Sequence, residues 1–250
     1  MPLAYDRPGD ATTIVHRWDD GFTWMAHPDE TMQRASHALA VGDDVWLMDP
    51  VDAVGLDDIV GELGHVAGVV VLSHAHRRQA ERLAKRHEVA VHVPSCIHVD
   101  AYPITEFTVP VKSFDDYLGN SGFELVWTAD AKFKQEGALY YPQRKTLVVS
   151  DILMTGFFAQ QNGRLEVFPF YPLFDIPVPT TELGALDVNR VLVGHGEPVV
   201  EQAQEALEDA LAEADRGTAR AMARNLPRFG RQVVEQFPDI ARTVYSELRN

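Results

Sequence analysis

Short apolar runs separated by turn-forming residues dominate the first half of the chain. Runs of about four to eight β-branched and apolar residues between Gly, Pro, Asn or Asp are typical of buried strands. They predict strands over 37–41, 45–48, 69–72, 89–93 and 123–126. Gly42-Asp43-Asp44 separates the first two runs, so these two strands are expected to form a hairpin.

A helical pattern lies between two of these runs. Ala80, Leu83 and Ala84 recur at helical spacing within 79–87, which predicts a helix between the strands at 69–72 and 89–93. A strand, a helix and a strand in succession favour a parallel crossover connection.

The second half repeats this alternation and then becomes helical. Strands are predicted over 138–141, 146–149 and 191–193, with a hairpin turn at 142–145 between the first two. Helical spacing follows over 197–213, and again over 219–250 with breaks near Pro227 and Pro238.

Mixed strands flanked by helices predict an α/β or α+β fold. No stretch of the chain divides the pattern convincingly. We therefore expect a single domain over residues 1–250, with a core over about 35–210 and a helical tail over about 211–250.

The charge balance narrows the range of partners. The chain carries 22 Lys and Arg against 37 Asp and Glu, which gives a formal net charge of −15. A phosphate backbone repels so acidic a surface, so nucleic acid is not expected as a partner. Only five of the cationic residues are lysines. This composition would suit a salt-rich cytoplasm, as in a halophile, and an ordinary acidic enzyme is the alternative.

Features of membrane and secreted proteins are missing from the sequence. The apolar runs are far shorter than the roughly 18 residues of a membrane span. Residues 1–10 lack the apolar centre of a signal peptide, and Cys96 is the one cysteine. We expect a cytoplasmic protein with no membrane partner.

Several apolar runs end in residues of the kinds that bind metal ions. His74 and His76 follow the run at 69–72, and two imidazoles with one residue between them can point at a single ion. Asp151 follows 146–149, and His195 follows 191–193. A rigid sheet would hold such side chains in place while loops shape a pocket around them.

In this order the segments resemble the metallo-β-lactamase superfamily. The matching segments are Leu47-Met48-Asp49-Pro50, Ser73-His74-Ala75-His76, the hairpin that begins at Gly137-Ala138 and leads to Ser150-Asp151, and Gly194-His195-Gly196-Glu197-Pro198. The resemblance covers about 35–210. It implies an αββα sandwich with a mononuclear or dinuclear zinc or iron site between loop ends.

The sequence also departs from the superfamily's metal-binding motif. The signature His-x-His-x-Asp-His reads His74-Ala75-His76-Arg77-Arg78-Gln79 here, so Arg78 replaces the aspartate and Gln79 the last histidine. A further histidine of the superfamily would fall near Lys132. Residue by residue, the resemblance implies the metal ligands His74, His76, Asp151 and His195, with Asp151 and His76 as catalytic candidates.

Two arrangements are compatible with this incomplete motif. In one, a single Zn (or Fe or Mn) is held by His74 and His76 together with Asp151 or His195. In the other, a fixed cation, Arg78 or Lys132, occupies the site in place of the metal, because two cations a few ångströms apart repel. A guanidinium paired with Asp151 could then replace the charge of the ion, and we favour this second arrangement.

The two arrangements imply different functions. A protein with a degraded site would have reduced or lost hydrolase activity, and its pocket would bind a small molecule or act as a scaffold. A mononuclear site would make the chain a metal-dependent hydrolase of an ester, a thioester or a related small substrate. Homo-oligomerisation stays open, as do the roles of the aromatic residues in 157–177 and of the arginine-rich tail.

Overall fold

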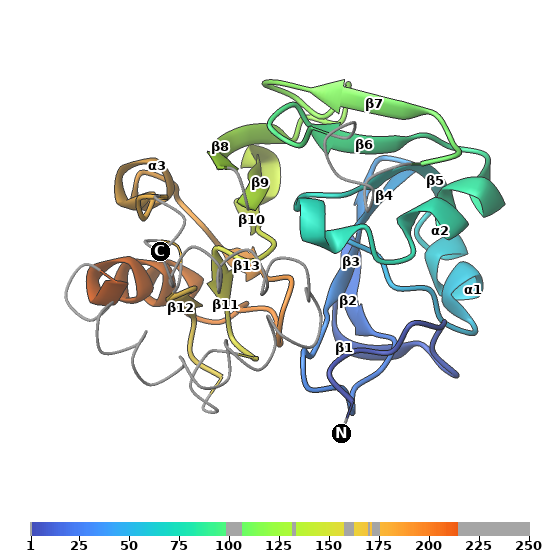
Figure 1. The fold of residues 1–250 in the computed structure, drawn as a ribbon, viewed down its shortest axis with the longest axis horizontal. Helices are drawn as coiled ribbons and strands as arrows, with labels where there is room; N and C mark the ends of the chain where they lie inside the picture. Colours follow the sequence, from blue (N-terminus) through green and yellow to red (C-terminus); the bar gives the residue numbers. More distant parts are fainter. Residues whose placement is uncertain are drawn as a thin grey trace, which may run out of the picture.

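Two β-sheets face each other across the centre of the molecule, with helices on their outer sides (Figure 1). The structure is a computed structural model, and it describes residues 2–98, 107–131, 134–157, 163–169, 171 and 176–214. The larger sheet has the strand order β1-β2-β3-β4-β5-β6-β7, and the smaller has the order β13-β10-β9-β8. A two-stranded sheet of β11 and β12 completes the strands.

The strands of the larger sheet are β1 (Thr13–Trp18), β2 (Gly21–Met25), β3 (Ser36–Val41), β4 (Asp44–Met48), β5 (His65–Val70), β6 (Val91–Pro94) and β7 (Val111–Phe114). The other strands are β8 (Glu124–Ala131), β9 (Lys134–Tyr141), β10 (Thr146–Val148), β11 (Leu153–Met154), β12 (Glu166–Val167) and β13 (Arg190–Leu192). The helices are α1 (Leu56–Gly61), η1 (His74–His76), α2 (Ala80–His87), η3 (Pro142–Arg144) and α3 (Thr180–Gly184), followed by a helix over 203–214.

Side chains that alternate between the two faces of each sheet form the inner and outer layers of the sandwich. Successive side chains of a strand point to opposite faces of its sheet. In β10, Val148 packs between the two sheets while Leu147 packs on the outer face. The layer between the sheets also contains residues from both of them: Leu39, Trp46, Met48, Val70, Leu139 and Leu192.

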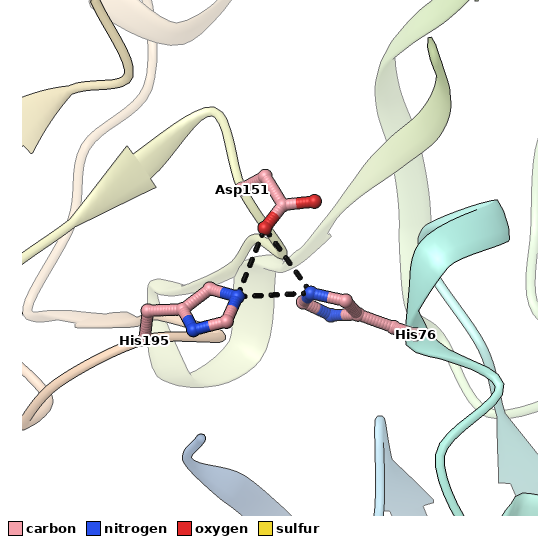
Figure 2. Close-up of side chains that lie close together, drawn as sticks. All are labelled: His76, Asp151 and His195. Carbon is pink, nitrogen blue, oxygen red and sulfur yellow. Dashed lines mark hydrogen bonds and ion pairs between the residues drawn. The ribbon is translucent and has the colours of Figure 1, made fainter. Parts of the chain in front are cut away.

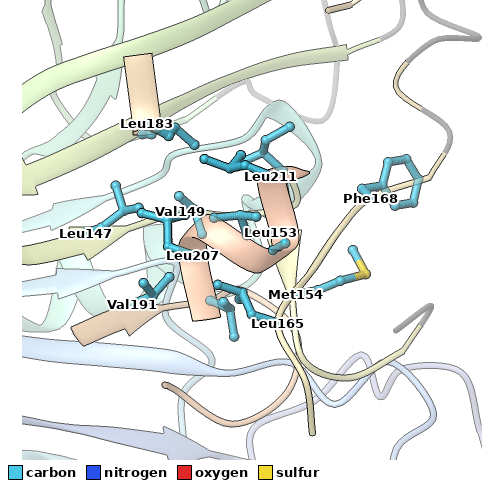
Figure 3. Close-up of a cluster of buried hydrophobic side chains, with 14 of the residues drawn as sticks. Leu147, Val149, Leu153, Met154, Leu165, Phe168, Leu183, Val191, Leu207 and Leu211 are labelled. Atoms are coloured by element: carbon cyan, nitrogen blue, oxygen red, sulfur yellow. The ribbon is translucent and has the colours of Figure 1, made fainter. Parts of the chain in front are cut away.

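Helices cover the outer face of each sheet. On the larger sheet, Leu56 and Val60 of α1 and Leu83 of α2 pack against strand residues such as Leu47 and Val69. On the smaller sheet, Leu183 of α3 packs with residues of the 203–214 helix and of the strands (Figure 3). Labelled members of this cluster are Leu147, Val149, Val191, Leu207 and Leu211. The layers are therefore helix, sheet, sheet and helix, as the sequence predicts.

The connections predicted from the sequence are confirmed. β3 and β4 form an antiparallel hairpin, and so do β9 and β10. β5 and β6 are parallel and are joined through α2. The strands β1, β2, β7, β11 and β12 were not predicted, and the helix expected over 197–213 is helical from 203 in the structure. The proposed tail beyond 214 lies outside the described residues.

Parallel pairing brings the carboxyl ends of several strands to one region of the molecule. β4 pairs parallel with β5, and β10 pairs parallel with β13. Asp49, the η1 residues, Asp151 and His195 lie just beyond these four strand ends. The fold thus gathers the side chains that the sequence marked as strand-end ligands.

Among the described residues, no helix has both the length and the apolar composition that a membrane span requires.

Candidate metal centre

Three side chains from separate strand ends meet at one point. His76 Nε2 lies 3.1 Å from His195 Nε2 and 3.1 Å from Asp151 Oδ1, and His195 Nε2 lies 3.0 Å from the same oxygen. Figure 2 shows the two rings turned edge-on toward each other with the carboxylate between them. Within the described ranges, these are the residues whose metal-binding atoms group within 4.8 Å. We call them the His-Asp-His cluster.

The far side of each ring is held by another group. His76 Nδ1 lies 2.7 Å from Asp49 Oδ2, and because an ionised carboxylate has no proton to give, the ring nitrogen donates. His195 Nδ1 donates to the Met32 carbonyl over 2.8 Å. With a proton on each Nδ1, each ring presents an unprotonated Nε2 to the centre when it is neutral. Such outer hydrogen bonds are typical of histidines that ligate metals.

Asp49 is itself fixed by its surroundings. Its Oδ1 accepts the Leu72 backbone N–H over 2.8 Å, and its Oδ2 accepts from the Ser150 hydroxyl. Asp49 also adopts a positive φ of 44°, a conformation that aspartate tolerates better than most residues other than glycine. Both oxygens of the carboxylate that contacts His76 are thus held by neighbouring groups.

Three acceptor atoms cannot lie this close without a positive charge among them. Burial and the charge of Arg78 lower the pKa of His76, but Asp151 and Asp49 outweigh them and raise it above its ordinary value. Burial lowers the pKa of His195. A proton on His76 or a metal ion can therefore supply the charge, and the two would compete for the same lone pairs.

The donor set fits a small divalent cation. Zn²⁺ prefers imidazole nitrogens and carboxylate oxygens at about 2.0–2.2 Å in tetrahedral geometry, which places donors about 3.3 Å apart. The observed separations of 3.0 to 3.1 Å are only a few tenths of an ångström shorter. The cluster would supply three protein ligands, the number that is usual for a catalytic zinc with one open position.

A buried lysine contacts the other oxygen of Asp151. Lys134 Nζ forms an ion pair with Asp151 Oδ2, a second ion pair with Glu136 Oε2 at 2.8 Å, and a hydrogen bond to Ser73 Oγ at 3.0 Å. The contacts with Asp151 and Ser73 are hydrogen bonds, and the contact with Glu136 is an ion pair. Glu136 is fully buried, and its Oε1 accepts the Ile152 backbone N–H.

The network keeps Asp151 and Lys134 charged, whereas burial raises the pKa of Glu136. Burial alone would raise the pKa of Asp151, but the charges of His76 and Lys134 hold it well below its ordinary value. Burial alone would lower the pKa of Lys134, but Asp151 and Glu136 raise it. Asp151 is therefore a carboxylate at neutral pH, suited to binding a cation and poorly suited to accepting a proton.

His74 lies beside the cluster rather than in it. Its Nδ1 is 3.1 Å from the backbone nitrogen of Gln135 and 3.2 Å from the Gln135 carbonyl oxygen, so the ring is tied to β9. Burial and the nearby charge of Lys134 lower the pKa of His74 to about 4. Of the four expected ligands, the structure brings together His76, Asp151 and His195.

The two residues that replace the missing ligands point elsewhere. Arg78, which we expected to pair with Asp151, donates to the carbonyls of Ala35, Asp49 and Gly194 at 2.6 to 2.8 Å. Gln79 accepts the backbone N–H of Asp52 over 2.7 Å. Arg78 therefore ties together three loops around the cluster, and burial lowers its pKa to about 10.

The cation at Asp151 is Lys134, whereas the sequence pointed to Arg78 or Lys132. Lys132 lies outside the described residues. Lys134, Asp49 and Glu136 were all missed as site residues. One feature of the sequence could have identified Lys134 and Glu136. They lie two residues apart just before the predicted strand at 138–141, so in an extended strand both side chains point to the same face.

The described aromatic residues of 157–177 lie in two places. The Phe157 ring lies 5.3 Å from the His195 ring, and Phe157 has a positive φ of 62°, which is rare for a bulky residue. Phe168 and Tyr171 are buried on the outer face of the smaller sheet, with Tyr171 6.0 Å from Lys134 Nζ. Phe158, Phe170 and Phe174 lie outside the described residues.

Neither a protein-family model nor a curated protein matches the chain in sequence. Solved structures do match its fold. TMB-1 superposes with a TM-score of 0.54 at 10% identity, covering 82% of this chain and 99% of TMB-1. The DIM-1 metallo-β-lactamase superposes with a TM-score of 0.54 at 11% identity, covering 82% and 98%. A metallo-β-lactamase from Hirschia baltica gives 0.54 at 10% identity, with 82% and 98% covered.

At these identities the likeness bears on the fold alone. It agrees with the helix-sheet-sheet-helix layers of the molecule. These matches, together with the layers and strand order of the molecule, show that the chain has the metallo-β-lactamase fold.

Proposed function

We propose that the chain is a hydrolase that uses one metal ion, held by His76, Asp151 and His195. The observation that carries this proposal is the convergence of three acceptor atoms within 3.1 Å, with both ring Nδ1 atoms already occupied by hydrogen bonds. When bound, the ion would supply Lewis-acid chemistry that polarises a carbonyl and makes water a better nucleophile at neutral pH. An ester, a thioester or a related small substrate fits this chemistry.

The chain's own residues position the site. Asp49 fixes the orientation of the His76 ring, and the Met32 carbonyl fixes that of His195. Lys134 holds Asp151 by its outer oxygen and leaves Oδ1 directed at the two rings. Because Lys134 is buried and its three contacts are all with protein side chains, we assign it a positioning role.

Lys134 also supports a site for one ion rather than two. A fixed ammonium on Asp151 Oδ2 would repel a second divalent cation on that side of the carboxylate. The proposed site would therefore hold one ion, and not the two that the sequence resemblance also allowed.

A metal-free protein is the second candidate. The Lys134–Asp151 ion pair favours it, because this contact already neutralises part of the charge that a metal would neutralise. A proton on His76 would supply the remaining positive charge. In that case the catalytic activity is lost, and the pocket acts as a binding surface.

An activity screen separates these two candidates. Purified chain supplied with Zn²⁺, Fe²⁺ or Mn²⁺ would be assayed on activated aryl esters and thioesters, next to His76→Ala and His195→Ala. His92→Ala serves as the control, because His92 is a buried histidine of β6 that lies outside the cluster. We expect activity in the parent and the control, with a loss of at least about a hundredfold in the cluster variants. Equal background rates in all four proteins would support the metal-free candidate.

A further inference from the structure

A group of cationic side chains surrounds a surface cavity along α2. The cavity has a volume of about 620 Å³ and is lined by seven residues of one segment. Five are cationic, one is acidic and one is an amide: Arg77, Arg78, Arg82, Lys85, Arg86, Glu81 and Gln79. Its size is within the range of about 300–1,000 Å³ that is usual for small-molecule sites. We call it the α2 cavity.

Its positive charge is only partly neutralised. The cations pair with three carboxylates, Asp52, Asp57 and Glu81. Arg78 faces away from the cavity, so four cations and three carboxylates leave an excess of one positive charge there, on a chain whose formal net charge is −15. A cationic patch on so acidic a molecule would draw small anions to this surface.

The cations and their partners lie at different depths. The Asp52 side chain is 3% exposed, whereas Arg82 is 61% exposed and Lys85 is 55% exposed. Glu81, at 17%, is likewise more buried than its partner Lys85. The third carboxylate, Asp57, is 46% exposed. The cationic ends of Arg82 and Lys85 therefore reach further toward solvent than the carboxylates they pair with.

Hydrogen-bond donors remain available at this surface. Within the described part of the chain, Arg82 contacts Asp52 through Nε, and Lys85 uses one proton on Glu81. The Nη atoms of Arg82 and two protons of Lys85 can therefore reach a bound oxyanion. Arg78 faces the opposite way, toward the carbonyls beside the His-Asp-His cluster.

We propose that the α2 cavity binds a small oxyanion that carries two or more negative charges, of the phosphate or polycarboxylate kind. Guanidinium groups match the oxygens of such anions with paired hydrogen bonds, and lysine adds a compact charge. Arg86 also contacts Asp52, so this buried carboxylate keeps a partner if Arg82 is replaced. The proposal does not depend on metal binding at the His-Asp-His cluster.

Calorimetric titration of chelator-treated, full-length chain tests the proposal, with inorganic pyrophosphate and citrate as separate probes at fixed ionic strength. The test variant is Arg82→Gln with Lys85→Gln. The matched control is Arg17→Gln with Lys145→Gln, which removes the same charge from two exposed ion pairs elsewhere on the surface. His195→Ala reports on anions that bind at the cluster instead.

We expect one probe to bind with one site per chain. The α2 variant should bind it at least about tenfold more weakly, with the control and His195→Ala within about twofold of the parent. A preference for pyrophosphate or for citrate identifies the phosphate or the carboxylate source. Circular dichroism confirms folding, and Lys85→Gln alone replaces a variant that fails to fold, with about threefold weaker binding expected.

Three results would overturn the proposal. They are no binding of either probe, equal weakening in the α2 variant and the charge-matched control, and loss of binding in His195→Ala. The last result would place the anion at the His-Asp-His cluster.

Discussion

At the scale of single residues, the site depends on the pairing of buried charges. Lys134 is enclosed with Asp151 and Glu136, and each of the three is costly to bury without its partners. In the proposed site, the same ammonium would hold Asp151 in place as a ligand and would repel a second ion.

Removing the Lys134 charge should destabilise the fold strongly. Lys134→Met leaves two buried carboxylates facing each other, and we expect the free energy of unfolding to fall by about 3–5 kcal/mol. Denaturant titration measures this change. Lys145→Met, which breaks an exposed ion pair with Asp187, should cost less than about 1 kcal/mol. Equal losses in both variants would contradict the network described for Lys134.

The sequence predicted the residues of the His-Asp-His cluster better than the residues that hold them in place. His76, Asp151 and His195 follow apolar strands, so their common location follows from parallel pairing. Lys134 was missed because counting along the motif pointed to Lys132, and the position of β9 is fixed by its pairing with β8. Asp49 follows the predicted strand at 45–48, but its contact with His76 depends on how two strands pack.

At the scale of elements, most strands with continuous apolar runs were predicted, whereas β1, β2, β7, β11 and β12 were not. β4, β5 and β10 were predicted because both of their faces are buried, which gives them nearly continuous apolar sequences. β1 has partly exposed faces and a mixed sequence, and β7 includes exposed Lys112 and Ser113. Their strand conformation comes from pairing with neighbours, which a single sequence does not show.

The contact between β6 and β4 contains a buried histidine that should make stability depend on pH. His92 packs edge-on against Trp46 at 5.1 Å, and burial, together with the charge of Lys112, lowers its pKa to about 4. The unfolded chain then binds more protons between pH 4 and the ordinary histidine pKa near 6.5, so stability falls as pH drops through this window. The contribution is on the order of 2–3 kcal/mol.

Replacing His92 should flatten this pH dependence. We expect the loss of unfolding free energy between pH 7 and pH 4.5 to be smaller in His92→Phe than in the parent. Denaturant titrations at several pH values measure it. His65→Phe, at an exposed position on the neighbouring β5, should retain the parent slope. An unchanged slope in His92→Phe would show that His92 is protonated without cost in the folded chain.

At the scale of the whole molecule, charge is distributed unevenly. A net charge of −15 is spread over the chain, while the α2 cavity concentrates cations on the outer face of the larger sheet. Self-repulsion of so acidic a molecule weakens when salt screens it. A gain in stability with salt would therefore agree with the proposed salt-rich habitat.

Molar KCl should therefore stabilise the protein. We expect the midpoint of thermal unfolding to rise by several degrees between about 0.1 M and 2 M KCl, because screening removes more repulsion than it costs in exposed ion pairs. Calorimetric scans over this range measure the shift. An unchanged or lower midpoint would remove the argument for adaptation to salt.

The central claim is that His76, Asp151 and His195 together bind one metal ion. Titration of chelator-treated chain with Co²⁺, followed by its visible absorption, and with Zn²⁺ in competition tests it most directly. We expect one ion per chain, a proton released on binding, and at least about tenfold weaker binding in His195→Ala, with His92→Ala unchanged. Binding far below one ion per chain, or equal affinity in His195→Ala, would contradict the claim.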